Sequence, residues 1–192
     1  DKLRVVPIGP GDERTRDLGG VELQTSNYDP VSCTADGRTV GFLGRRAGEE
    51  PRGWVLDLED GKPPRAVTPG PVRNVRIAPD GRRLVAVGAG SLPEIYDVAT
   101  GAKSPVPGAL AGEVVVAWSR GSDALFVWDQ KLPARVERLD LATGRRDLAF
   151  EWRPLGGAEG LYGLLNVTTD ARHFLMRFRS GASTLAVARG AR

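Results

Sequence analysis

The stretch that decides the fold spans residues 77–101 and reads IAPDGRRLVAVGAGSLPEIYDVATG. It opens with Pro79-Asp80-Gly81, a turn in which proline presets φ, aspartate bonds to nearby backbone and glycine accepts a positive φ. The apolar run 84–88 follows and predicts a strand that is buried on both faces. A second strand is expected over residues 94–98, and Ala99-Thr100-Gly101 then turns the chain again.

Variants of both turns recur along the chain with one spacing. The first turn begins at residues 36, 80, 121 and 170, at steps of 44, 41 and 49 residues. The second turn occupies residues 57–61, 97–101 and 140–144, at steps of 40 and 43 residues. A shared period of this length with several short strands per unit is typical of β-propeller blades.

The repeats also resemble a known family. The segments APDGRRLVAV, IYDVATG and RVERLDLATGRR resemble TolB-type, WD-repeat-like β-propeller repeats. Over residues 27–192 the layout resembles the propeller C-terminal to some bacterial serine/threonine protein kinases and other signalling proteins. The chain has no Gly-His dipeptide and no Trp-Asp dipeptide at strand ends, apart from Trp128-Asp129 in a different place. The TolB-like kind is therefore favoured over eukaryotic-type WD repeats.

We expect an all-β chain, a single partial propeller over residues 1–192. It has about four blades of four-stranded antiparallel sheet plus an N-terminal half blade, and it forms part of a larger propeller. The repeats are expected at approximately 1–20 (the half blade), 21–70, 71–110, 111–153 and 154–192. No helix is expected, because glycine or proline interrupts almost every window of a dozen residues. The half blade lacks inner strands and the last blade an outer one, which favours an open array that self-associates through its strand edges.

The composition is that of an ordinary globular protein, with 41% hydrophobic and 27% charged residues. The net charge is only +3 and the arginines are scattered, which disfavours a nucleic-acid partner. No apolar run approaches the roughly 20 residues that span a bilayer, so no membrane segment is expected in this chain. The single cysteine allows no internal disulfide, and cytoplasmic, periplasmic and extracellular locations all stay open.

No catalytic motif is visible: the chain has no Gly-x-Ser-x-Gly, no P-loop and no kinase signature. The only histidine, His173, precedes a second strand and is expected at the surface. Cys33 aligns with apolar residues that end inner strands and is expected to be buried and inert. Asp36, Asp80 and Asp170 are expected to bond to backbone within their turns. We therefore expect no catalytic, metal or cofactor site in this chain.

Binding is expected on the face where loops of successive blades converge. These are the loops 45–52 and 129–135, after second strands, and 152–159, which enters the last blade. Aromatic and arginine side chains are enriched in binding hot spots, although structural packing is the favoured role of the tryptophans. The predicted binding residues are Arg45, Arg46, Trp128, Lys131, Arg135, Trp152 and Arg153.

The basic bias of these loops predicts an acidic or phosphorylated protein or peptide partner. The favoured function is a non-catalytic protein-interaction or sensor propeller module of a bacterial signalling protein. The alternative is the propeller accessory domain of a hydrolase or other enzyme whose catalytic part lies outside this chain.

Overall fold

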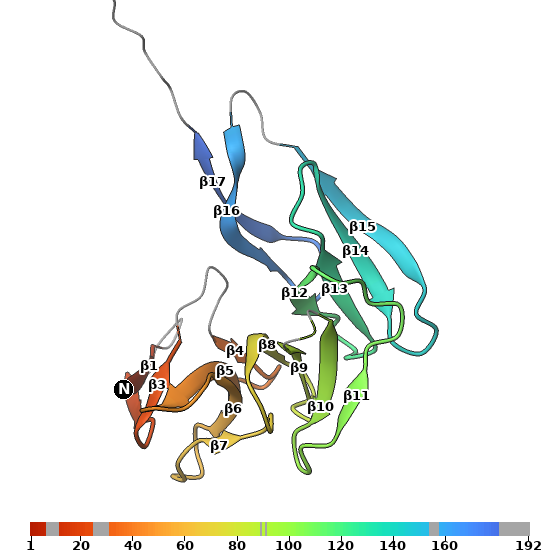
Figure 1. Cartoon of the computed structure of the whole chain (residues 1–192). Helices are drawn as coiled ribbons and strands as arrows, with labels where there is room; N and C mark the ends of the chain where they lie inside the picture. Colours follow the sequence, from red (N-terminus) through yellow and green to blue (C-terminus); the bar gives the residue numbers. More distant parts are fainter. Residues whose placement is uncertain (7–11, 25–30, 89, 91, 154–157, 181–192) are drawn as a thin grey trace, which may run out of the picture.

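The computed structural model describes residues 1–6, 12–24, 31–88, 90, 92–153 and 158–180, and all regular elements there are β-strands (Figure 1). No helix in this part of the chain is long and apolar enough to cross a membrane. The strands form antiparallel sheets that follow one another in chain order, as expected for propeller blades. The all-β prediction is confirmed.

The chain begins with the expected half blade, a two-stranded antiparallel sheet of β1 (Lys2–Val5) and β2 (Arg14–Asp17). The first blade follows, and two short strands share one edge of its long strand β5. The strands of this blade are β3 (Val21–Leu23), β4 (Val31–Cys33), β5 (Thr39–Arg46), β6 (Arg52–Asp57) and β7 (Arg65–Ala66).

The second and third blades are four-stranded antiparallel sheets, with the strands in sequence order from one edge to the other. The second contains β8 (Val72–Ile77), β9 (Arg83–Gly88), β10 (Pro93–Asp97) and β11 (Lys103–Pro105). The third contains β12 (Val114–Trp118), β13 (Ala124–Trp128), β14 (Ala134–Asp140) and β15 (Arg146–Trp152). A hairpin of β16 (Ala158–Val167) and β17 (Phe174–Ser180) begins the fourth. The further strand expected at 184–188 lies outside the described residues.

The core lies between the blades, because their central strands are buried on both faces. In β9, Leu84 and Ala86 pack toward the first blade, whereas Val85 packs toward the third. In β13, Leu125 packs toward the second blade, whereas Phe126 packs on the opposite face, in the cluster that contains Val167. Successive side chains of a strand point to opposite faces, so a fully apolar strand serves two interfaces.

Polar contacts also join neighbouring inner strands. The hydroxyl of Ser32 accepts a hydrogen bond from the backbone N–H of Ile77 at 2.9 Å. The indole Nε1 of Trp118 donates to the backbone carbonyl of Arg76 at 3.0 Å. Inner strands β4, β8, β12 and β16 therefore lie next to one another in chain order (Figure 1).

One strand was missed by the sequence analysis. Val21–Leu23 forms β3 and pairs with Gly44, Arg45 and Arg46. This pairing is possible because β5 runs to Arg46, so β4 occupies only its first part.

Candidate functional site

The aspartates of the first repeated turn act within the turn. Asp36 accepts hydrogen bonds from the hydroxyl of Thr34 at 2.6 Å and from the backbone N–H of Arg38 at 3.0 Å. Asp170 does the same in the fourth blade, with the hydroxyl of Thr168 at 2.6 Å. The threonine hydroxyl in each case, followed by the backbone bond, lowers the pKa of the carboxyl group. These bonds confirm the structural role that the repeat position predicted.

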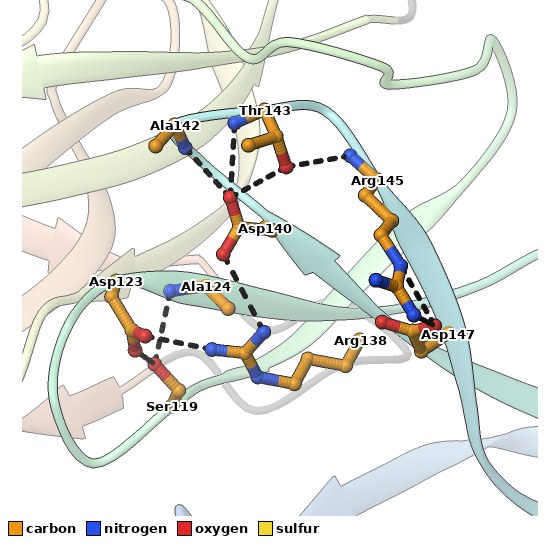
Figure 2. A network of polar contacts seen from close by, with 9 residues as sticks. All are labelled: Ser119, Asp123, Ala124, Arg138, Asp140, Ala142, Thr143, Arg145 and Asp147. Carbon is orange, nitrogen blue, oxygen red and sulfur yellow. Dashed lines mark hydrogen bonds and ion pairs between the residues drawn. The ribbon is translucent and has the colours of Figure 1, made fainter.

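The third blade elaborates the same turn into a network (Figure 2). Asp123 accepts a hydrogen bond from the hydroxyl of Ser119 at 2.6 Å, which is the main reason that its pKa is lowered. The guanidinium of Arg138 reaches Asp123 at 2.7 Å and Asp140 at 3.6 Å, which joins the two turns. Asp140 also accepts the Thr143 hydroxyl at 2.8 Å. These carboxylates therefore stabilise turns and do not form a catalytic pair.

The described residues contain no group of three or more His, Cys, Asp or Glu side chains that is arranged to hold a metal ion. His173 is exposed, as predicted, and its backbone N–H donates to the Thr168 hydroxyl at 3.0 Å.

Cys33 is exposed, so the expectation of a buried cysteine was wrong. Its counterparts Ile77 and Trp118 are buried because each packs against the complete blade before it. The sheet before Cys33 is the two-stranded half blade β1–β2. Cys33 instead borders a cleft of about 240 Å³ between the inner strands.

Trp128 does not lie on the binding face, which corrects its predicted placement. Its side chain is only 3% exposed and packs with Phe126 in the interface that follows the third blade. Its Nε1 donates to the backbone carbonyl of Lys131 at 3.2 Å. Trp128 is the last residue of β13 and follows the alternation of the strand, so its side chain points into the core. Its contact with Lys131 holds the β13–β14 loop against that core.

The other predicted residues of the third blade do gather at one end of the sheet. Arg135 lies opposite Glu151 in the β14–β15 ladder, with 3.9 Å between guanidinium and carboxylate. Arg153 pairs with the same carboxylate at 2.9 Å. Trp152 is half-buried against the core beneath them. With the exposed Lys131 and Leu132 of the adjoining hairpin, these residues form what we call the third-blade patch: Lys131, Leu132, Arg135, Trp152 and Arg153.

Arg45 and Arg46 stand apart from this patch, at the end of β5 in the first blade. Arg45 pairs with Glu22 of β3 at 3.4 Å. The guanidinium of Arg46 lies 5.5 Å from the centroid of the Trp54 ring, within cation–π range. These two contacts lie within the first blade. Apart from the buried Trp128, the predicted residues therefore fall into two groups.

A groove of about 820 Å³ on the outer flank of the first blade was not anticipated. It follows β6 and β7 from the β5–β6 hairpin to the β6–β7 turn, and Gly81 and Val98 of the second blade form part of its wall. The only sequence signal was the pair Pro63-Pro64 in the outer turn. We call this feature the flank groove; its charged lining residues are Arg46, Glu49, Arg52, Asp57, Asp60, Lys62 and Arg65.

Comparison with known proteins places the fold. No family model and no curated protein matches the chain. Among solved structures, TolB from Acinetobacter baumannii is 16% identical, with a TM-score of 0.57 over 87% of this chain and 45% of that one. Oligogalacturonate lyase from Vibrio parahaemolyticus is 16% identical, with a TM-score of 0.53 over 91% of this chain and 58% of that one.

A prolyl endopeptidase is 12% identical, with a TM-score of 0.54 over 84% of this chain and 26% of that one. This chain thus spans well under two thirds of the length of these structures. At such identities the likeness concerns the fold alone. It agrees with the sheets described above, which have the arrangement of a partial β-propeller.

Proposed function

We propose that this chain is a non-catalytic docking module, the protein-interaction or sensor propeller of a bacterial signalling protein. The third-blade patch is the observation that carries the proposal. It combines three exposed cations with an exposed leucine and a half-buried tryptophan at the end of one blade. Interaction hot spots are enriched in tryptophan and arginine, and loops on a rigid scaffold are common binding elements.

The charges of the patch indicate the partner's chemistry. Arg135 and Arg153 share one carboxylate, that of Glu151, and their side chains are 55% and 73% exposed. Lys131 is 80% exposed beside Asp129. Three cations therefore face two carboxylates, and the guanidinium groups retain donors for a ligand. Because guanidinium binds carboxylate and phosphate in a bidentate manner, an acidic or phosphorylated protein segment fits this surface.

The test uses two fluorescein-labelled nonapeptides that carry a central leucine flanked by either phosphoserine or serine. Fluorescence anisotropy measures their binding to the chain and to the variants Arg135→Ala, Arg153→Ala and Leu132→Ser. Each substitution is expected to weaken binding of the phosphopeptide by more than about 1 kcal/mol and to leave the thermal transition unchanged. Arg82→Ala, in the exposed turn at the opposite end of the second blade, is the matched control. Equal affinity of all four variants would reject the patch as the docking surface.

The alternative, an accessory propeller of a hydrolase, draws on the fold likeness to a prolyl endopeptidase and to puromycin hydrolase. This chain covers only 26% and 25% of those proteins, so a catalytic domain would be a separate part of the polypeptide. The sequence of the flanking domains separates the two functions. A hydrolase domain beside the propeller supports the alternative, and a kinase or other signalling domain supports docking.

A further inference from the structure

The flank groove gathers three arginines that form no ion pair with a described carboxylate. Elsewhere arginine side chains commonly pair with carboxylates, as Arg38 does with Glu59 at 2.9 Å. Within the described part of the chain, Arg46, Arg52 and Arg65 take part in none of the ion pairs. All three line the same groove.

Each of these arginines is positioned without a carboxylate. Arg46 is held by its contact with the ring of Trp54. Arg65 donates one hydrogen bond from Nη2 to the backbone carbonyl of Val98, at 2.5 Å, which leaves its other donors open. The Nε of Arg52 is buried and has no hydrogen-bond partner among the described residues. Arg52 as a whole is only partly buried, so the other nitrogens of its guanidinium group are the ones available to a ligand.

Two of the carboxylates in the groove are already engaged. Asp57 accepts hydrogen bonds from the backbone N–H groups of Glu59 at 2.8 Å and Asp60 at 3.1 Å. Asp60 accepts the backbone N–H of Lys62 at 2.9 Å and lies 3.6 Å from its ammonium group. Only Glu49 adds a further carboxylate to the lining. Four cationic side chains therefore face three carboxylates in the lining, and the guanidinium groups retain hydrogen-bond donors for a ligand.

The shape of the groove favours an extended ligand. Strand β7 has only two residues and pairs only with Trp54 and Val55 of β6. The next two partners in this register are Pro64 and Pro63, which have no N–H and end the ladder. By contrast, the outer strand of the third blade, β15, covers seven residues. The shortened β7 leaves room beside β6, and the volume of about 820 Å³ is within the range of ligand sites.

We propose that the flank groove binds an extended acidic peptide segment, whose carboxylates pair with Arg46, Arg52 and Arg65. The inference rests on the proposed docking function, but it assigns a second place and a partner chemistry that the third-blade patch does not require. The arginines lie along the groove from the β5–β6 hairpin to the start of β7. A peptide with glutamate at alternate positions can place successive carboxylates along that path, because alternate side chains of an extended chain share one face.

The experiment measures the anisotropy of a fluorescein-labelled nonapeptide with alternating glutamate and alanine, and of its glutamine analogue. The chain is expected to bind the glutamate peptide and not the analogue, and added salt is expected to weaken binding through screening. Arg52→Ala and Arg65→Ala are each expected to lower the affinity roughly tenfold, a loss typical of hot-spot arginines. Arg172→Ala, in the exposed turn of the fourth blade, serves as the control, and thermal melts verify that each variant is folded.

A charge exchange makes the test specific. Arg65→Glu is expected to lose the glutamate peptide and to gain the corresponding lysine peptide. Heparin is the competing polyanion: if it binds as tightly as the peptide and the groove variants weaken both ligands equally, the site is a general anion surface and the inference fails. If Arg135→Ala and Arg153→Ala weaken the glutamate peptide while the groove variants do not, docking through the third-blade patch stands and the flank groove is rejected. If no variant in either place affects any peptide, both proposals fail.

Discussion

Replacing Arg146 with methionine tests the most buried ion pair in the described part of the chain. Arg146 begins β15, and its guanidinium contacts the carboxylate of Glu113, whose side chain is only 4% exposed. The same group reaches Glu137 at 2.7 Å and donates to the backbone carbonyl of Gly108 at 2.9 Å. Glu113 also accepts the backbone N–H of Leu110 at 2.9 Å. Arg146 thus holds the connection between the second and third blades against β15.

The size of the effect follows from the burial of Glu113. Methionine keeps most of the aliphatic packing of Arg146 but leaves the Glu113 carboxylate buried beside no cation. Loss of one partner of a buried pair costs about 3–5 kcal/mol. Arg146 is itself 22% exposed, which allows some hydration of the site, so we expect the lower end, about 3 kcal/mol. For a chain of this size that loss lowers Tm by about 6–12 °C.

The adjacent residue supplies a matched control. Arg145 pairs with Asp147 at 2.8 Å, but the two side chains are 75% and 50% exposed. Arg145→Met is therefore expected to cost less than about 1 kcal/mol. Urea and thermal unfolding, followed by circular dichroism, measure both variants. Adding Glu113→Gln to Arg146→Met is expected to restore part of the loss, because the buried charge is removed. Equal stability of the two single variants would refute the reasoning.

Three further predictions concern the blades. The lowered pKa of Asp123 stabilises the fold above the unfolded pKa of about 3.9, and this contribution is lost as pH falls through the lower folded pKa; urea titrations at pH 2–6 are expected to show a shallower acid loss for Asp123→Asn. A Cβ at Gly41 would lie 2.8 Å from the Cβ of Ile77, across the interface between the first and second blades. Gly41→Ala is therefore expected to lower the free energy of unfolding, measured in urea, by about 1–3 kcal/mol. Trp118→Phe removes the donor to the Arg76 carbonyl and is expected to cost at least about 1 kcal/mol, with faster amide exchange in β8 and β12.

The repeat pattern predicted the blades because turn chemistry and strand alternation are local. Asp36 and Asp170 form the same turn bonds, and the apolar run of β9 is buried on both faces. The exposure of Cys33 and the burial of Trp128 are not determined by the local sequence. Each depends on the sheet that lies alongside: a two-stranded half blade near Cys33, and Phe126 with Val167 beside Trp128. Alignment of one blade with another cannot supply that neighbour.

The flank groove also eluded the sequence analysis, and its origin explains why. In the second and third blades, the threonine of the outer turn donates its hydroxyl to the turn aspartate, in each case at 2.8 Å: Thr100 to Asp97, and Thr143 to Asp140. In the first blade, Asp60 replaces this threonine and Pro63-Pro64 follows, so the outer strand has only two residues.

The groove and its unpaired arginines therefore lie where the first blade departs from the repeat. Residues that every blade shares are explained by the fold, because the same bonds recur wherever they occur. Arg46, Arg52 and Arg65 have no such explanation: no described carboxylate pairs with them, and Arg52 holds a buried donor without an acceptor. The lining does contain carboxylates, those of Glu49, Asp57 and Asp60, but none of them forms an ion pair with these three guanidinium groups. A ligand that supplies the carboxylates accounts for both the shortened strand and the charges beside it.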